Sequence, residues 1–292
     1  MSIRGFFLFG KGVHFLTEAP IMKQLPNLSQ LTFPAYRSLL KGVKIGNDDI
    51  FLEDRYEGVF INEEQRVAYR DLFEFSEELP LTLLYPLAQR AHLDLMLDKR
   101  FTIGVPGMVH LSNSLWLTAP VDHAKPFDLE ASVHVETKKE GSLLPLLKLD
   151  YYQDGRQVAY CESRYLARRK SKVKSTRKEA EPFTISNIEH REHWSLIPAI
   201  AKEYATISGD SNPIHTSRLA ARLVGFKKRI IHGWYNASRI TAAAEKLKGK
   251  PSRRLDIRFL KPVFLPSELD LKIGGGEECH FLLENEKHRL VE

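Results

Sequence analysis

The sequence contains little cysteine and no long uninterrupted apolar run. Only Cys161 and Cys279 occur in 292 residues, in no metal-ligand or redox spacing, which argues against a disulfide framework and a zinc site. No run reaches the roughly 18 apolar residues that a membrane-spanning helix needs. The first residues are interrupted by Gly and Lys and lack a small-residue cleavage site. We therefore expect a cytoplasmic protein with no membrane span, metal or other cofactor.

Acidic residues are absent from one stretch. From Arg164 to Lys178 the chain has eight basic residues and no acid, within a net charge of +6. Such a block most often is a solvated linker. The alternative is an anionic partner, namely the phosphates of a cofactor, an acidic carrier protein or nucleic acid. Nucleic acid is the least favoured partner, because Tyr165 is the one aromatic residue in the block.

The length and the 43% hydrophobic content suffice for a sizeable core, and two domains are the better expectation. Residues 1–50 show no long periodic segment and are interpreted as an extension that packs on a domain. The stretch 79–97, "LPLTLLYPLAQRAHLDLML", has apolar residues at helical spacing and few positions left for solvent. It predicts a buried helix, and several strand-like runs separated by turn signals follow it.

The same order of patterns returns after the basic block. "HGWYNASRITAAAEKLKG" predicts a second buried helix, and "RRLDIRFLKPVFLPSELDLKIGGG" predicts paired strands. "LSNSLWLTAPVDHAKPFDLEASV" and "LDIRFLKPVFLPSELDLKI" share a strand, a Pro-Val step and a second strand. We interpret this as a diverged internal repeat, in which each half wraps an antiparallel sheet around a central helix.

One segment of the second half combines an acid and an imidazole in a turn that leads into a helix. In "YATISGDSNPIHTSRLAARLVGFKKRIIH", Asp210 stands five residues before His215, with turn-forming Asn212 and Pro213 between them. The segment after Pro213 is expected to form a helix that ends at Gly225. Asp and His so placed suit general acid-base chemistry. The alternative is that Asp210 only caps the helix. Metal binding is disfavoured, because no third ligand is adjacent in sequence.

A second feature follows at His232 and Gly233, directly before the predicted buried helix. There the backbone N–H of Gly233 would lie at a helix N-terminus, where the dipole favours developing negative charge such as that of a thioester enolate. The alternative is that Gly233 only permits close packing and that His232 is a packed side chain.

The stretch "YATISGDSNPIHTSRLAARLVGFKKRIIHG" resembles the signature of the MaoC-like dehydratases, the (R)-specific enoyl-CoA hydratase (hydratase 2) family. The resemblance covers about residues 186–285, and the first half is similar, by pattern only, to the degenerate repeat of two-repeat members. It implies an α+β double hot-dog fold. The expected organisation is an N-terminal extension (1–50), a non-catalytic repeat (51–165), a basic linker (166–185) and a catalytic repeat (186–292).

The resemblance also implies roles for particular residues. Asp210 and His215 would be a catalytic dyad that polarises a water, Asn212 would orient that water, and Gly233 would donate its N–H to the thioester oxygen. Further expected contributors that bind substrate or support the site are Ser238, His232 and Trp234. Trp234 stands where Met is commoner in the family, and its bulk could narrow the acyl pocket. Apart from the resemblance, three basic residues stand near the site in sequence, namely Lys227, Lys228 and Arg229. They could meet the phosphates of CoA or the acidic surface of an acyl carrier protein, or they could be the exposed end of a helix.

The resemblance implies reversible hydration of trans-2-enoyl thioesters to (R)-3-hydroxyacyl thioesters, with an acyl-CoA or an acyl-carrier-protein thioester as substrate. Which of Asp210 and His215 acts as the acid stays open. The alternatives are a hot-dog protein that binds acyl thioesters without hydrating them, and a thioesterase. A two-repeat chain could supply its own internal pairing, so that monomer and homodimer are both compatible with the sequence.

Overall fold

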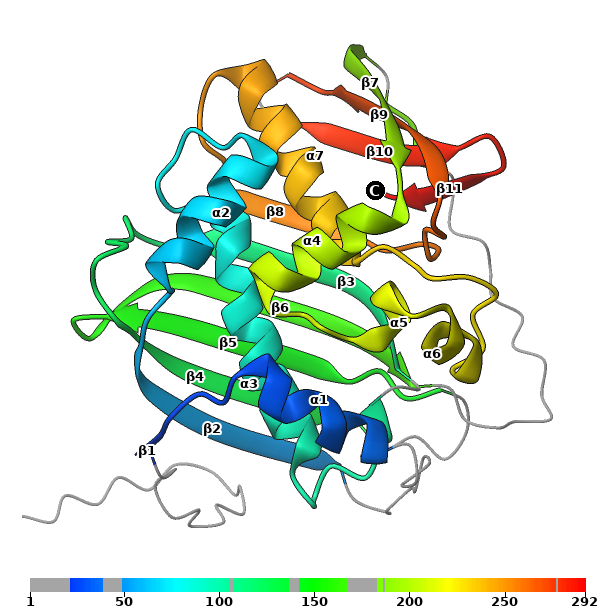
Figure 1. Cartoon of the computed structure of the whole chain (residues 1–292). Coiled ribbons are helices and arrows are strands. Elements are labelled where there is room, and N and C mark those ends of the chain that lie inside the picture. The colour runs from blue at the N-terminus through cyan, green and yellow to red at the C-terminus, as the bar shows by residue number, and fades with distance from the viewer. Residues whose placement is uncertain are drawn as a thin grey trace, which may run out of the picture.

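A computed structural model describes residues 22–38, 49–105, 108–136, 142–167, 183–185, 187–276 and 278–292. The strands, nearly all of them antiparallel, form a seven-stranded sheet and a four-stranded sheet, which together curve around the helices (Figure 1). Most of the predicted basic linker falls outside the described residues, as does the start of the N-terminal extension.

The first repeat holds five strands and one long buried helix. Its elements are β2 (Ile50–Val59), α2 (Glu63–Phe73), a 3-10 turn (Leu81–Leu84), α3 (Tyr85–Leu97), β3 (Met108–Leu117), β4 (Phe127–Val135), β5 (Leu146–Gln153) and β6 (Arg156–Ala167). The strands lie in the order β2-β4-β5-β6-β3. Buried and less buried residues alternate along β4 and β5, as expected for a sheet with one face on the core.

The second repeat has the same sequence of elements with a longer connection before its central helix. Its elements are β7 (Ile188–Leu196), α4 (Pro198–Ser208), α5 (Pro213–Thr216), α6 (Arg218–Leu223), α7 (Gly233–Lys248), β8 (Arg254–Arg258), β9 (Ser267–Gly274), β10 (His280–Asn285) and β11 (His288–Val291). Strands β7, β9, β10 and β11 are neighbours in that order, which matches the order β2-β4-β5-β6 of the first repeat.

The two repeats join edge to edge. Strand β3 pairs antiparallel with β8, so each repeat contributes its equivalent strand to the junction. The Arg258 and Glu292 backbones exchange hydrogen bonds of 2.6 and 3.1 Å next to a bridge between Phe259 and Val291, which continues the sheet from β8 to β11. The repeated strand order confirms the predicted two-repeat hot-dog architecture.

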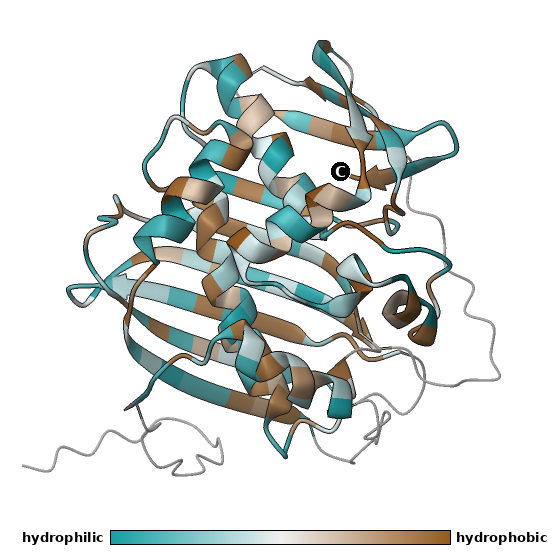
Figure 2. Cartoon of the chain, viewed as in Figure 1, coloured by the Kyte–Doolittle hydropathy of each residue, from teal (hydrophilic) through white to brown (hydrophobic). Residues whose placement is uncertain are grey.

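Helices α3 and α7 are the central helices that the apolar spacing predicts. Both helices bury apolar residues in the core, and Figure 2 shows apolar and polar residues mixed along the strands that surround them. The predicted helix 79–97 divides into the 3-10 turn and α3, because Pro86 lacks an N–H and suits only the first turn of an α-helix. None of the helices in the described ranges is both long and apolar enough to cross a membrane.

The described part of the N-terminal extension adds a two-residue strand, β1 (Met22–Lys23), beside β2, and a helix, α1 (Leu28–Arg37). The sequence pattern did not reveal α1, because Pro34 stands inside it. A capping box between Asn27 and Gln30 begins the helix, and buried Leu28 and Leu31 hold it against the core.

Candidate functional site

The acid and the imidazole lie in the connection between α4 and α7. Helix α4 ends at Gly209, whose φ of +78° is readily available only to glycine. The Asp210 carboxylate then accepts the Asn212 N–H at 3.2 Å, and the Asn212 side chain accepts the Ile214 N–H at 3.3 Å. These local bonds turn the chain sharply and start α5 at Pro213.

Two details of this segment differ from the sequence prediction. Asn212, rather than Asp210, is the N-cap of the helix that carries His215. The Asp210 carboxylate is therefore not used to cap that helix. The helix expected to run on to Gly225 is divided into α5 and α6 at Ser217, whose side chain accepts the Ala220 N–H at 3.3 Å. Ser217 caps a new helix because its hydroxyl competes with the continuing helical bond.

Three titratable side chains converge at this connection. One potential ligand atom from each of Asp210, His215 and His232 lies within 4.8 Å of the others. The imidazoles of His215 and His232 are stacked, with their ring centroids 3.7 Å apart. The two rings are buried and the carboxylate is half-buried, so the electrostatic interaction between them is only partly screened by water.

The hydrogen bonds of the two imidazoles define their tautomers. Nδ1 of His215 lies 2.9 Å from the Ile230 carbonyl, and Nε2 of His232 lies 3.0 Å from the Asp210 carbonyl. A carbonyl only accepts, so these nitrogens carry the hydrogens. The lone pair of His215 is therefore on Nε2, and that of His232 is on Nδ1, which has no hydrogen-bond partner among the described residues.

Burial keeps both imidazoles uncharged. It lowers the pKa of His215 below its usual value, and it lowers the pKa of His232 to about 3. Burial alone would raise the pKa of the Asp210 carboxyl, but the neighbouring imidazoles and hydrogen-bond donors outweigh burial and lower it. At neutral pH the site therefore pairs an ionised carboxylate with a neutral imidazole that has a free lone pair.

Gly233 begins α7 directly after buried His232. As the first residue of the helix, its N–H has no intrahelical acceptor, and the glycine is exposed between buried neighbours. A Cβ atom at this position would lie 3.1 Å from the Phe259 ring. The backbone thus presents a donor where the helix dipole favours negative charge.

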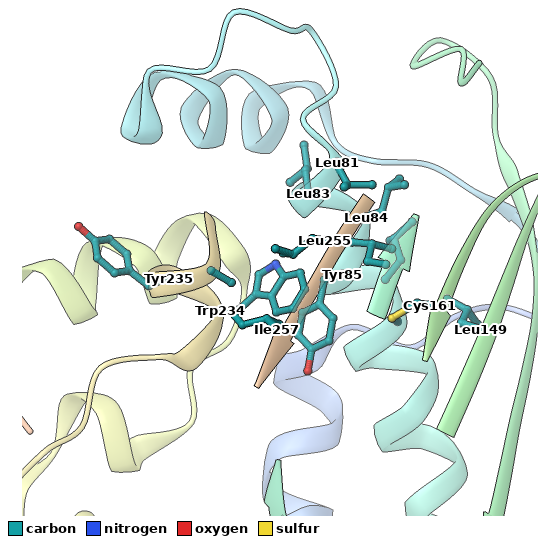
Figure 3. Close-up of a cluster of buried hydrophobic side chains, with 14 of the residues drawn as sticks. Leu81, Leu83, Leu84, Tyr85, Leu149, Cys161, Trp234, Tyr235, Leu255 and Ile257 are labelled. Atoms are coloured by element: carbon teal, nitrogen blue, oxygen red, sulfur yellow. The ribbon is translucent and has the colours of Figure 1, made fainter. Parts of the chain in front are cut away.

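Trp234 and Ser238 make contacts with the first repeat rather than with the dyad. The Trp234 indole stacks on Tyr85 with centroids 3.8 Å apart and donates to the Thr82 carbonyl at 2.8 Å. Figure 3 shows these two rings together in a buried apolar cluster. Ser238 is buried, and its hydroxyl bonds to the Trp234 carbonyl and the Tyr69 hydroxyl.

The basic residues after α6 lie near the site in sequence but point largely to solvent. Lys227 and Lys228 are exposed, and Arg229 is half-buried with its guanidinium 3.4 Å from the Thr216 carbonyl. Helix α6 itself exposes Leu219 and Leu223, which are 70% and 81% accessible. Apolar and cationic side chains therefore form one exposed surface beside the α5 segment that carries His215.

Two residues from the first 100 positions reach the site and were missed by the sequence analysis. Gln89 on α3 donates to Oδ2 of Asp210 at 2.7 Å. Tyr36 on α1 donates to Oδ1 of Asn212 at 2.6 Å. A polar residue inside a helix predicted to be buried was the one available signal for Gln89, and nothing in the sequence marked Tyr36.

His232 also changes the assessment of metal binding. The sequence analysis found no third ligand beside Asp210 and His215, whereas the fold brings His232 to them from 17 residues further along the chain. Three donors could hold an ion. The same lone pairs and carboxylate oxygens also suffice for acid-base chemistry without one.

Comparison with known proteins agrees with this fold. Residues 169–278 match the family described as "MaoC like domain". A curated protein of Mycobacterium tuberculosis, 3-hydroxyacyl-thioester dehydratase X, is 39% identical over 82 residues, which are 28% of this chain and 29% of that protein. The match thus spans less than a third of the curated relative.

Solved structures extend the likeness of fold over most of the chain. HtdX of Mycobacterium tuberculosis aligns with a TM-score of 0.64 and 22% identity, over 84% of this chain and 97% of the other. The peroxisomal multifunctional enzyme type 2 of Drosophila melanogaster aligns with a TM-score of 0.59 and 16% identity, over 92% of this chain and 52% of the other. Most of the chain therefore has a fold already seen in other proteins.

Proposed function

We propose that this chain, which contains a MaoC-like domain on a two-repeat hot-dog fold, catalyses the reversible hydration of trans-2-enoyl thioesters to (R)-3-hydroxyacyl thioesters. One observation carries the proposal, namely that Asp210 and His215 converge beside the exposed N-terminus of α7. The name of the curated relative, a 3-hydroxyacyl-thioester dehydratase, supports the same reaction class.

In this mechanism His215 is the base toward water. Its Nδ1–H is held by the Ile230 carbonyl, so Nε2 has the lone pair that takes a proton as the water oxygen attacks C3. The ionised Asp210 carboxylate accepts the second hydrogen of the same water and orients it. The proton that His215 has taken from water then passes to the Asp210 carboxylate, and Asp210 delivers it to C2 on the same face, so that both side chains regain their starting charge.

The negative charge that develops during attack is on the thioester oxygen. We assign its stabilisation to the Gly233 N–H and the dipole of α7, because a donor fixed in place before reaction costs no reorganisation during it. Asn212 would orient the water, and His232 would hold the loop through its bond to the Asp210 carbonyl.

We assign carrier recognition to the exposed surface of α6 and the residues after it. Arg218, Arg222, Lys227 and Lys228 are exposed there together with Leu219 and Leu223. Such a surface suits the phosphates of CoA or the acidic surface of an acyl carrier protein. Measuring kcat/KM for one acyl chain on CoA and on an acyl carrier protein, at low and at high salt, distinguishes the two carriers. The carrier that is recognised through more exposed charges should show the steeper fall of kcat/KM with salt.

The test of the reaction is a spectrophotometric hydration assay on enoyl-CoA substrates from four carbons upward, with the chirality of the product determined. We expect loss of the enoyl absorbance and formation of the (R)-3-hydroxyacyl thioester. Release of free thiol would instead identify a thioesterase. Binding of the thioesters without either product would identify a non-catalytic acyl-binding protein.

A further inference from the structure

The first half of the chain contacts the candidate site through two side chains. Gln89 and Asp210 are separated by 121 residues, and Tyr36 and Asn212 by 176, yet each pair forms a side-chain hydrogen bond shorter than 2.8 Å. Both donors come from segments that lie outside the matched MaoC-like domain. They come from the central helix of the first repeat and from the N-terminal extension.

Gln89 completes the hydrogen bonding of the Asp210 carboxylate. Its amide donates to Oδ2, while the Asn212 N–H donates to Oδ1, so each carboxylate oxygen has a donor in a fixed direction. The imidazoles of His215 and His232 help to lower the pKa of the carboxyl, but their hydrogen bonds go to the carbonyls of Ile230 and Asp210 and not to the carboxylate oxygens. The orientation of the carboxylate therefore depends on these two hydrogen bonds.

The helix that carries Gln89 is itself held firmly. The neighbouring Arg90 donates to the carbonyls of Leu25 and Pro26, both at 2.8 Å. Ala88 and Ala91 on either side are fully buried. A side chain that extends from so fixed a backbone keeps its donor in place.

Tyr36 fixes the orientation of the Asn212 amide. Its hydroxyl and the Ile214 N–H both donate to Oδ1 of Asn212, so the carbonyl side of the amide faces them. The NH2 group consequently points the other way and is presented as a donor. An amide turned by 180° would place its NH2 group against the Ile214 N–H, which can only donate.

From these contacts we propose that Gln89 and Tyr36 are positioning residues of the active site, through which the first repeat and the N-terminal helix orient Asp210 and Asn212. This inference rests on the proposed hydratase function. The first repeat is then part of the catalytic machinery, although it has no acid-base pair of its own.

Replacing Gln89 tests the first bond. Gln89→Met keeps the length and bulk of the side chain and removes the donor. We expect kcat to fall about 10- to 100-fold, the range for a hydrogen bond to a charged group, with KM changed less than about twofold because ground-state binding is untouched. Loss of the donor raises the Asp210 pKa, so the acidic limb of the kcat profile shifts to higher pH.

Gln157→Met is the matched control. Gln157 also donates its amide to an aspartate, Asp150, but does so between β5 and β6, away from the dyad. This variant should lose a comparable hydrogen bond while keeping the wild-type pH profile and kcat. Equal losses in the two variants, in parallel with equal falls in melting temperature, would mean a merely structural role for Gln89 and would overturn the proposal.

Tyr36→Phe tests the second bond and should have the smaller effect. A neutral hydrogen bond supports a fall in kcat of about 3- to 10-fold. Tyr160→Phe is its control, since the Tyr160 hydroxyl donates to Glu162 at 3.3 Å on another part of the sheet. Wild-type kcat in Tyr36→Phe would remove Tyr36 from the proposal.

A readout without substrate separates this inference from the proposed reaction. In protein labelled with 15N-glutamine, the side-chain signal of Gln89 is assigned by its loss in Gln89→Met. In Asp210→Asn we expect that signal to move while the Gln157 signal stays. If the wild type hydrates no enoyl thioester but the Gln89 signal moves, the reaction is wrong and the contact is real. An unmoved signal overturns the inference regardless of activity.

Discussion

The two repeats have the same strand order but differ in the connection before the central helix. In the first repeat α2 ends at Glu74 in the left-handed conformation, and buried Phe75 follows. In the second, α4 ends at Gly209 in the same conformation, and Asp210 follows. Only the second connection is long enough to hold α5 and His215. The strands and central helices are therefore alike in the two repeats, and the candidate acid-base residues lie in one connecting segment of the second repeat.

The two central helices also differ in the residues of their first turns. Helix α3 has Pro86, which has no N–H, in its first turn. Helix α7 begins with Gly233, which offers an N–H and no side chain. Proline is compatible with the start of α3 because the first N–H groups of a helix have no intrahelical acceptor.

The largest expected effect is loss of the dyad from the second repeat. Asp210→Asn or His215→Ala should each lower kcat by roughly 10²- to 10⁴-fold, the usual contribution of a general acid or base. Asp150→Asn, which removes a half-buried carboxylate from the first repeat, is the control. Steady-state hydration assays measure all three. Wild-type turnover in either dyad variant would refute the assignment.

The contact between the repeats gives the second prediction. Trp234→Ala removes a buried ring that stacks on Tyr85 and the indole donor to the Thr82 carbonyl. We expect the free energy of unfolding to fall by about 3–5 kcal/mol, as for other buried tryptophans. Trp116→Ala removes a half-buried tryptophan that packs on Tyr160, and it should cost less. Denaturant unfolding measures both, and equal costs would argue against a tightly packed junction.

Much of the fold was predictable because it depends on local patterns. The helical spacing of 79–97 and the small apolar residues after Gly233 marked the two central helices, and the Pro-Val strand pairs marked the repeat. Helix α1 was not predictable, because a proline inside a helical pattern usually marks the end of a helix and Pro34 stands inside this one. The break at Ser217 was missed because serine is common both inside helices and at their caps.

The candidate site was predictable only where its residues are close in sequence. Asp210, Asn212 and His215 lie within six positions, and turn chemistry alone places them near one another. Gln89 and Tyr36 approach through tertiary packing of helices, which no short pattern encodes. His232 was predicted beside the site, but its stacking on His215 depends on how the loop folds back.

Gly233 provides a test of the difference between the helix starts. Gly233→Pro gives α7 the kind of start that α3 has, since proline is tolerated in the first turn while its missing N–H removes the proposed oxyanion donor. We expect kcat to fall about 10²- to 10³-fold.

The added bulk of the proline needs its own control, because a Cβ at this position would lie 3.1 Å from the Phe259 ring. Gly233→Ala adds that Cβ atom and keeps the N–H, and it should lose much less activity. Equal falls in kcat in the two variants would mean that the added bulk, and not the missing N–H, lowers the activity. Hydration kinetics and melting temperature are measured for both.

The smallest expected effect concerns the pH dependence of stability and a buried histidine of the first repeat. His92 is fully buried on α3, and neither ring nitrogen makes a well-formed hydrogen bond with the described residues. Burial lowers its pKa from 6.5 to about 3. Below pH 6.5 the unfolded chain therefore binds a proton that the folded chain does not, and stability falls as the pH falls toward the folded pKa.

His92→Met should remove this one proton from the pH dependence of stability. One histidine contributes up to about 1.4 kcal/mol per pH unit between the two pKa values. The free energy of unfolding of the variant should therefore decline less steeply than that of the wild type from pH 6 to pH 5. Urea titrations at several pH values measure the slopes, and a wild-type slope in His92→Met would show that His92 takes up its proton inside the folded repeat.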